Sequence, residues 1–146
     1  MAKNLLSTSR SLPIALLRAR ERVMGPIRAV LVDADVTEQQ WRVLRVLHES
    51  GPLDPTRIAE QACLLLPSLT RILKKLEEKA LIQREQNLTD KRRQIVQITT
   101  AGAALIEANL ESSVAVMEKV RTQMRPDRYE ALLDLLNELD ASGKGE

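Results

Sequence analysis

Residues 67–98 read PSLTRILKKLEEKALIQREQNLTDKRRQIVQI, and the spacing of their apolar residues changes once along the way. Apolar residues of the first part recur every three or four positions, at Leu69, Ile72, Leu73 and Leu76, which predicts a helix with one buried stripe. After Leu81, residues 82–86 and 94–98 alternate instead, as half-buried strands do. The polar segment 87–93 between them predicts a β-hairpin whose loop is longer than two residues.

A second, shorter helix is predicted just before this stretch. Asp54 is a favourable N-cap and Pro55 suits the first helical position. The helix ends near Ala62, and its inward positions are Ile58, Ala59 and Ala62. Residues 63–66 then connect it to the helix from Pro67, although the glycine that is usual in such a turn is missing. Two helices in this arrangement, followed directly by a hairpin, predict a winged helix-turn-helix.

The preceding segment contains a clear helix start at Thr37, which forms a capping-box pattern with Gln40. Gly51-Pro52 predicts the end of that helix. Farther upstream, apolar residues at helical spacing predict another helix, along Leu12, Leu16, Ala19, Val23, Ile27 and Val30. Gly25-Pro26 interrupts this stripe, so we expect a kink or a break there.

Two more helices are expected after the hairpin, one capped by Thr100 and one starting at Pro126. With the first helix they offer more apolar surface than one winged helix covers, and a homodimer would bury the surplus. The expected fold is mainly α and a single domain over 1–146. Its parts are a winged helix-turn-helix lobe over 34–100 and dimerisation helices over 10–33 and 101–141.

Composition excludes several classes of function. The 146 residues are 44% hydrophobic but 1% aromatic, so proteins that stack nucleic-acid bases on aromatic side chains are excluded. One histidine, no glycine-rich phosphate loop and no metal-ligand cluster predict neither an enzyme nor a bound metal or cofactor. A single cysteine, and the lack of a signal peptide or a long apolar run, favour the cytoplasm and no contact with a membrane.

The net charge is only +2, so the distribution of the charges has to identify a partner. On the helix from Pro67 the face opposite the apolar stripe is polar and cationic, which suits the major groove of double-stranded DNA. We expect DNA contacts from this helix and from the first turn of the helix before it, at Thr56, Ser68, Thr70, Arg71, Lys74 and Lys75. The alternative is a solvated cationic face without a partner.

The hairpin loop contains a second group of cations, Lys91, Arg92 and Arg93. The minor groove of DNA attracts guanidinium groups where it is narrow. Asp90 has the wrong charge for DNA, so we expect it to hold Arg92 or to cap the turn. An ordinary charged turn is the alternative interpretation.

Cys63 has apolar neighbours in the sequence, Ala62 and Leu64, and no adjacent cation. A redox-sensing cysteine needs an accessible thiolate of low pKa. We therefore expect a buried core residue. A redox-responsive role for Cys63 is the alternative.

These features together identify a resemblance. The order of the helices, the loop sequence Asp90-Lys91-Arg92 and the segment 98–102 at the start of the long helix resemble the MarR family of winged-helix transcriptional regulators. Segments 11–21, 37–42 and 62–70 are similar to those members of the family that control the degradation of homoprotocatechuate and 4-hydroxyphenylacetate.

The resemblance implies a dimeric repressor that binds a pseudo-palindromic operator and releases it when a small phenolic or aromatic carboxylic acid binds. It implies an effector site between the dimerisation helices and the DNA-binding lobe. Arg18 or Arg20 would pair with the effector carboxylate, Ser11 would donate a hydrogen bond, and Trp41 would cover the aromatic ring. The alternatives are a redox-responsive regulator that uses Cys63 and a winged-helix interaction module that does not bind DNA.

Overall fold

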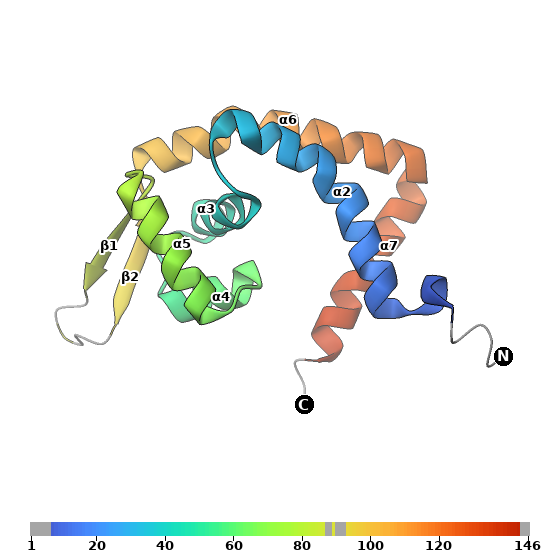
Figure 1. Cartoon of the computed structure of the whole chain (residues 1–146), viewed down its shortest axis with the longest axis horizontal. Helices are drawn as coiled ribbons and strands as arrows, with labels where there is room; N and C mark the ends of the chain where they lie inside the picture. The colour runs from blue at the N-terminus through green and yellow to red at the C-terminus, as the bar shows by residue number, and fades with distance from the viewer. Residues whose placement is uncertain (1–6, 87–88, 90–92, 144–146) are drawn as a thin grey trace. The chain divides into compact units, whose positions relative to one another are not determined.

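The structure is a computed structural model that describes residues 7–86, 89 and 93–143 (Figure 1). Its elements in chain order are η1 (Thr8–Arg10), α2 (Leu12–Ala34), α3 (Glu38–Ser50), α4 (Pro55–Ala62), α5 (Leu66–Glu78), β1 (Ile82–Gln86), β2 (Gln94–Ile98), α6 (Thr100–Met124) and α7 (Pro126–Ser142). The fold is mainly α with one two-stranded sheet, as the sequence predicts. None of the described helices has the length and hydropathy that a membrane span needs.

The chain divides into two compact units. The terminal unit comprises Met1–Pro26 and Ser112–Glu146, and the central unit comprises Ile27–Glu111. The central unit contains the whole segment 34–100 in which the sequence predicts the winged helix.

The core of the central unit is aliphatic, with Trp41 as its aromatic member. Helix α3 begins with the predicted capping box: the Thr37 hydroxyl accepts from the Gln40 amide nitrogen at 3.1 Å, and the Gln40 side chain accepts from the Thr37 amide at 3.1 Å. Gly51, at φ +79°, ends the helix. The Asp54 carboxylate caps α4 by accepting from the Arg57 amide at 2.9 Å, again as predicted.

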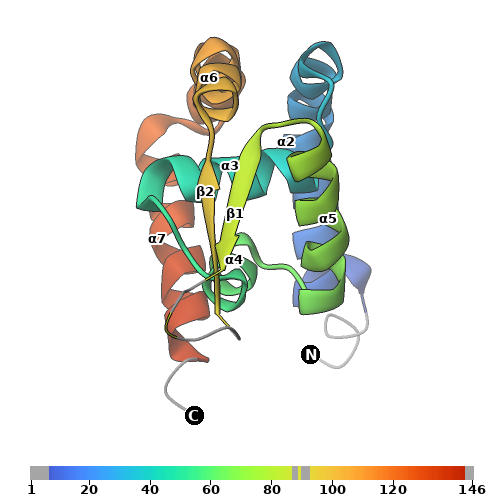
Figure 2. The same ribbon diagram turned by 90° about the vertical axis from the view of Figure 1, so that its left-hand side faces the viewer.

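The two strands lie side by side and pair antiparallel (Figure 2). Their register places Ile82 opposite Ile98 and Arg84 opposite Val96. Leu53, in the loop before α4, adds an antiparallel bridge to Val96. Val96 is fully buried, so the hairpin is attached to the helices through the middle of β2. The hairpin packs on α5 through β1 and on α3 and α4 through β2.

The start of α6 differs from the expectation in one detail. Thr99, not Thr100, is the N-cap, because the Thr99 hydroxyl accepts from the Gly102 amide at 3.1 Å. The same hydroxyl donates to the Ala80 carbonyl at 2.8 Å. Thr99 therefore connects the end of α5 to α6.

Helix α2 continues through Pro26, so of the predicted kink or break, the break does not occur. Proline removes one backbone donor and disfavours the preceding turn, yet apolar residues on both sides of it keep the helical spacing. Beyond Pro26, Ile27 and Leu31 are buried in the central unit. In the terminal unit, by contrast, no described side chain is buried.

Candidate nucleic-acid interface and effector residues

Helix α5 separates a buried face from a cationic one. Leu69, Leu73 and Leu76 are buried. Of the predicted DNA-contacting residues on this helix, Ser68 is half-buried, and the others are exposed: Thr70, Arg71, Lys74 and Lys75. The Thr70 hydroxyl donates to the Leu66 carbonyl at 3.0 Å, which leaves its oxygen lone pairs as acceptors.

One open groove borders this face. A second lies between α4 and the hairpin, which we call the wing. The α3–α5 groove, of about 350 Å³, is lined by Thr37, Gln39, Gln40, Leu64, Ser68, Arg71, Ile72 and Lys75. It brings three of the predicted residues, Ser68, Arg71 and Lys75, to the first turn of α3. Gln39 is exposed there, and the sequence analysis missed it because only the tertiary structure places α3 beside α5.

The α4–wing groove, of about 710 Å³, is lined by Asp54, Pro55, Thr56, Arg57, Glu60, Gln61, Arg93 and Gln94. It brings together Thr56 and Arg93, which the sequence analysis predicted from two separate motifs. Arg57 is a further cation in this groove that the analysis missed. The sequence signal that could have identified Arg57 is its position next to Thr56 in the first turn of α4.

Three of the predicted residues, Asp90, Lys91 and Arg92, lie outside the described residues. The described Arg93 is exposed and directly precedes β2. Between β1 and α5 an ion pair joins Arg84 Nη2 to Glu77 Oε1 at 2.9 Å. The hydrogen bond from Arg84 holds the pKa of the Glu77 carboxyl below its ordinary value of 4.5.

Cys63 is exposed, so the prediction of a buried core cysteine is wrong. Cys63 follows the last residue of α4 and has a left-handed backbone, at φ 55°. The next amide, of Leu64, donates back to the Ala59 carbonyl at 2.9 Å, which turns the chain toward α5 and the Cys63 side chain away from the apolar stripe of α4. This is the position that glycine favours at a helix end.

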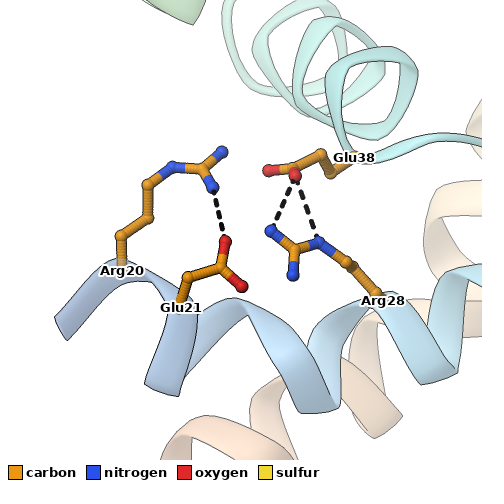
Figure 3. Close-up of polar contacts among 4 residues, drawn as sticks. All are labelled: Arg20, Glu21, Arg28 and Glu38. Carbon is orange, nitrogen blue, oxygen red and sulfur yellow. Dashed lines mark hydrogen bonds and ion pairs between the residues drawn. The ribbon is translucent and has the colours of Figure 1, made fainter. Parts of the chain in front are cut away.

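Three of the four predicted effector residues lie in the terminal unit. The Ser11 hydroxyl accepts from the Ile14 amide at 3.5 Å, at the start of α2. Arg18 and Arg20 are both exposed. Residues two positions apart on a helix are separated by about 200° around its axis, so the two arginines lie on nearly opposite faces of α2. Arg20 Nη1 lies 3.8 Å from Glu21 Oε1, a pair drawn in Figure 3.

The fourth predicted effector residue, Trp41, lies in the central unit and is 7% exposed. The next residue, Arg42, has a buried Nε without a hydrogen-bond partner among the described residues. A second pair in Figure 3 joins the end of α2 to the start of α3, with Arg28 Nε and Nη2 each 3.2 Å from Glu38 Oε1. No group of three or more His, Cys, Asp or Glu in the described part of the chain is arranged to hold a metal.

Comparison with known proteins gives consistent matches. The model of the MarR family matches residues 36–93. The chain is 39% identical to the HTH-type transcriptional regulator FarR of Neisseria gonorrhoeae over 129 residues, which cover 88% of each protein. It is 36% identical to the homoprotocatechuate degradative operon repressor of Escherichia coli over 133 residues, or 91% of this chain and 90% of the repressor.

Solved structures resemble this one over most of their length. The crystal structure of NadR in complex with 4-hydroxyphenylacetate has a TM-score of 0.78 and 39% identity, over 88% of this chain and 92% of NadR. The repressor CouR bound to a 23-mer DNA duplex has a TM-score of 0.82 and 26% identity, over 93% of this chain and 96% of CouR.

Proposed function

The chain belongs to the MarR family, and from that premise we propose that it is a homodimeric transcriptional repressor, released from its DNA operator by a small aromatic carboxylic acid. Its relatives are transcriptional regulators, not enzymes. The observation that carries the proposal is the cationic face of α5, which is exposed opposite a fully buried stripe and lies beside the hairpin.

DNA binding follows from the shape and the charge of this face. An α-helix fits the major groove, where arginine and lysine donate to guanine and serine or threonine bonds base edges or phosphates. The cations of the hairpin loop would reach the neighbouring minor groove. A dimer has two such lobes, so its operator would be pseudo-palindromic, with half-sites about 34–36 Å apart. The solved complex of CouR with a DNA duplex supports this arrangement by its similarity.

Dimerisation is supported by the terminal unit. Its described residues bury no side chain, yet they include nine of the large exposed apolar residues: Leu12, Leu16, Leu17, Val114, Leu132, Leu133, Leu135, Leu136 and Leu139. Exposing so many large apolar side chains to water is unfavourable, and a second copy of the unit would cover them.

An aromatic acid as effector is supported by two similar proteins. One is named for the homoprotocatechuate degradative operon, and the other was solved with 4-hydroxyphenylacetate bound. In this chain we assign the carboxylate to Arg18 or Arg20, a hydrogen bond to Ser11 and the ring to Trp41. Arg42 is a further candidate for the carboxylate, because its buried Nε has no partner among the described residues and such a donor is costly to leave unsatisfied.

Release is a shift between two arrangements of the dimer. The effector would bind more tightly to the arrangement whose lobes do not match the operator, and only this difference in affinity moves the equilibrium. Shifting the population from 1:99 to 99:1 takes about 5.5 kcal/mol of differential affinity. Two effector molecules per dimer would each need to supply about half of that.

A gel-shift experiment tests the proposal. The probe is the DNA upstream of the chain's own gene, and we expect a shift that 4-hydroxyphenylacetate or homoprotocatechuate abolishes. A weak, salt-insensitive association with duplex DNA would instead support a winged-helix interaction module. Trp41 is the single tryptophan, so its fluorescence should change with the acid in the wild type and less in Arg20→Ala and Arg42→Ala.

One observation favours a second mode of regulation, namely the exposure of Cys63. An exposed thiol is accessible to peroxide, which would oxidise it to a sulfenic acid and release water. We expect peroxide to weaken DNA binding of the wild type and not of Cys63→Ser. If both proteins respond equally, Cys63 has no sensing role.

A further inference from the structure

The α3–α5 groove and the α4–wing groove differ in charge. The lining of the α4–wing groove contains Arg57 and Arg93, but also the carboxylates of Asp54 and Glu60. The α3–α5 groove is lined by Arg71 and Lys75, and its described lining contains no carboxylate. A phosphate group would therefore be attracted by the α3–α5 groove much more strongly than by its neighbour.

Some of the polar side chains of the α3–α5 groove already have partners inside the protein. Thr37 and Gln40 hold each other in the capping box. The Gln40 side chain also accepts from Lys79 Nζ at 3.4 Å, and the same Nζ donates to the Asp35 carbonyl at 2.6 Å. The remaining polar lining residues are Gln39, Ser68, Arg71 and Lys75. They supply an amide, a hydroxyl and two cations, the usual donors to phosphate oxygens.

Helical geometry separates two adjacent lysines on α5. Ser68, Ile72 and Lys75 are spaced by four and three residues, so they share one flank of the helix, and all three line the groove. Lys74 lies about 100° away around the axis and does not line it. Arg71 lies between the two lysines around the helix axis, so comparing Lys74 with Lys75 separates the two faces of α5 better than a comparison that uses Arg71.

We propose that the α3–α5 groove holds one backbone phosphate of the DNA, with Gln39, Ser68 and Lys75 as its donors, and that Lys74 reads a base edge. The proposal rests on the proposed DNA-binding function and assigns distinct roles within it. The ion pair of Lys75 Nζ with Glu78 Oε2, at 3.8 Å, is solvent-exposed and therefore too weak to keep Lys75 from a phosphate.

The lysines provide a matched pair of variants, Lys74→Ala and Lys75→Ala. The probes are a duplex that the wild type selects from a random library and a mixed-sequence duplex of equal length, each titrated at several salt concentrations. Lys75→Ala should weaken binding to both duplexes alike and reduce the slope of log affinity against log salt by about 1. Lys74→Ala should keep that slope and reduce the preference for the selected duplex about tenfold.

Gln39→Glu tests the α3 side of the groove without endangering the fold. A carboxylate in the first turn of a helix is favourable, so the thermal midpoint should not fall. The same carboxylate would repel a phosphate, and binding to the mixed-sequence duplex should drop several-fold. Arg45→Gln, on an exposed residue of α3 that does not line the groove, lowers the net charge by the same amount and should change binding far less.

The outcomes separate the inference from the proposed function. If the wild type binds neither duplex, DNA binding itself is wrong. If the wild type binds and both lysine variants change slope and preference equally, the division of roles is overturned. Wild-type affinity in Gln39→Glu would remove α3 from the phosphate site.

Discussion

Single charged residues serve two purposes in the central unit. Lys74 and Lys75 point outward from α5 and are available to a partner. Glu77, one turn farther along the same helix, pairs instead with Arg84 of β1. The pair ties the hairpin to the helix that we assign to the major groove, so it should help to hold the wing at a constant position.

Glu77→Gln should make the protein less stable at neutral pH, with a difference that disappears in acid. The folded state holds the pKa of Glu77 below its ordinary value of 4.5. The stabilisation is therefore fully present above about pH 4.5 and is lost as the pH falls through the lowered, folded-state pKa. Urea unfolding of both proteins over a pH series measures this difference directly.

Arg84→Ala provides the control for that experiment. Without the guanidinium, Glu77 loses the partner that lowers its pKa. Repeating Glu77→Gln in this background should give a difference that no longer depends on pH. A pH-dependent difference of the original size would show that Arg84 is not its cause.

Cys63→Gly should stabilise the central unit by up to about 1 kcal/mol. Cys63 has a left-handed backbone, at φ 55°, which strains a residue with a Cβ atom but not glycine. Thermal unfolding measures the gain. Cys63→Ala removes the thiol and keeps the Cβ atom, so it should show no comparable gain; an equal gain would assign the effect to the thiol.

At the scale of the elements, the hairpin and α6 meet at a junction that leaves no room for a side chain at residue 102. Gly102, in the first turn of α6, is buried. A Cβ atom at Gly102 would collide with the Leu81 carbonyl oxygen and lie 2.6 Å from Ile98 Cγ1. The end of β2 and the start of α6 can therefore approach the turn after α5 only because residue 102 lacks a side chain.

Gly102→Ala should destabilise the protein by about 1–3 kcal/mol, because the added methyl group overpacks the junction. Helix propensity alone would act in the opposite direction, by about 1 kcal/mol. Denaturant unfolding decides between the two. Ala104→Gly, at an exposed position of the same helix, calibrates the propensity effect; a stabilised Gly102→Ala would mean that the junction can open without cost.

At the scale of the whole molecule, the two units bury their apolar residues very differently. Every buried hydrophobic residue in the described chain lies between Ile27 and Ile106, in the central unit. In the terminal unit the described part of α7 contains five leucines that are 37–61% exposed. The central unit therefore has a core of its own, whereas the terminal unit needs a partner.

The double variant Leu133→Glu/Leu136→Glu should convert the dimer to a monomer. Burying carboxylates in an apolar interface costs several kcal/mol, so the dimer dissociation constant should rise at least about a hundredfold. Sedimentation velocity measures the oligomeric state, and far-UV circular dichroism checks the helices. Leu65→Glu, at a residue 77% exposed in the central unit, is the control and should remain dimeric.

The sequence by itself determined the local structure. Side chains that act within a few residues determine the capping box at Thr37, the cap at Asp54 and both strands of the hairpin. The structure confirms all of these features. The cationic face of α5 was predictable for the same reason, because helical spacing alone separates it from the buried leucines.

Only the tertiary structure decided which distant residues meet. It placed Gln39 beside α5 and Arg57 beside Arg93. Packing between elements controls these features, and the pattern within one element contains no information about its neighbours. The partner of a capping residue lies three positions away in the sequence. The residues that line a groove come from separate elements, so the groove forms only when the central unit folds.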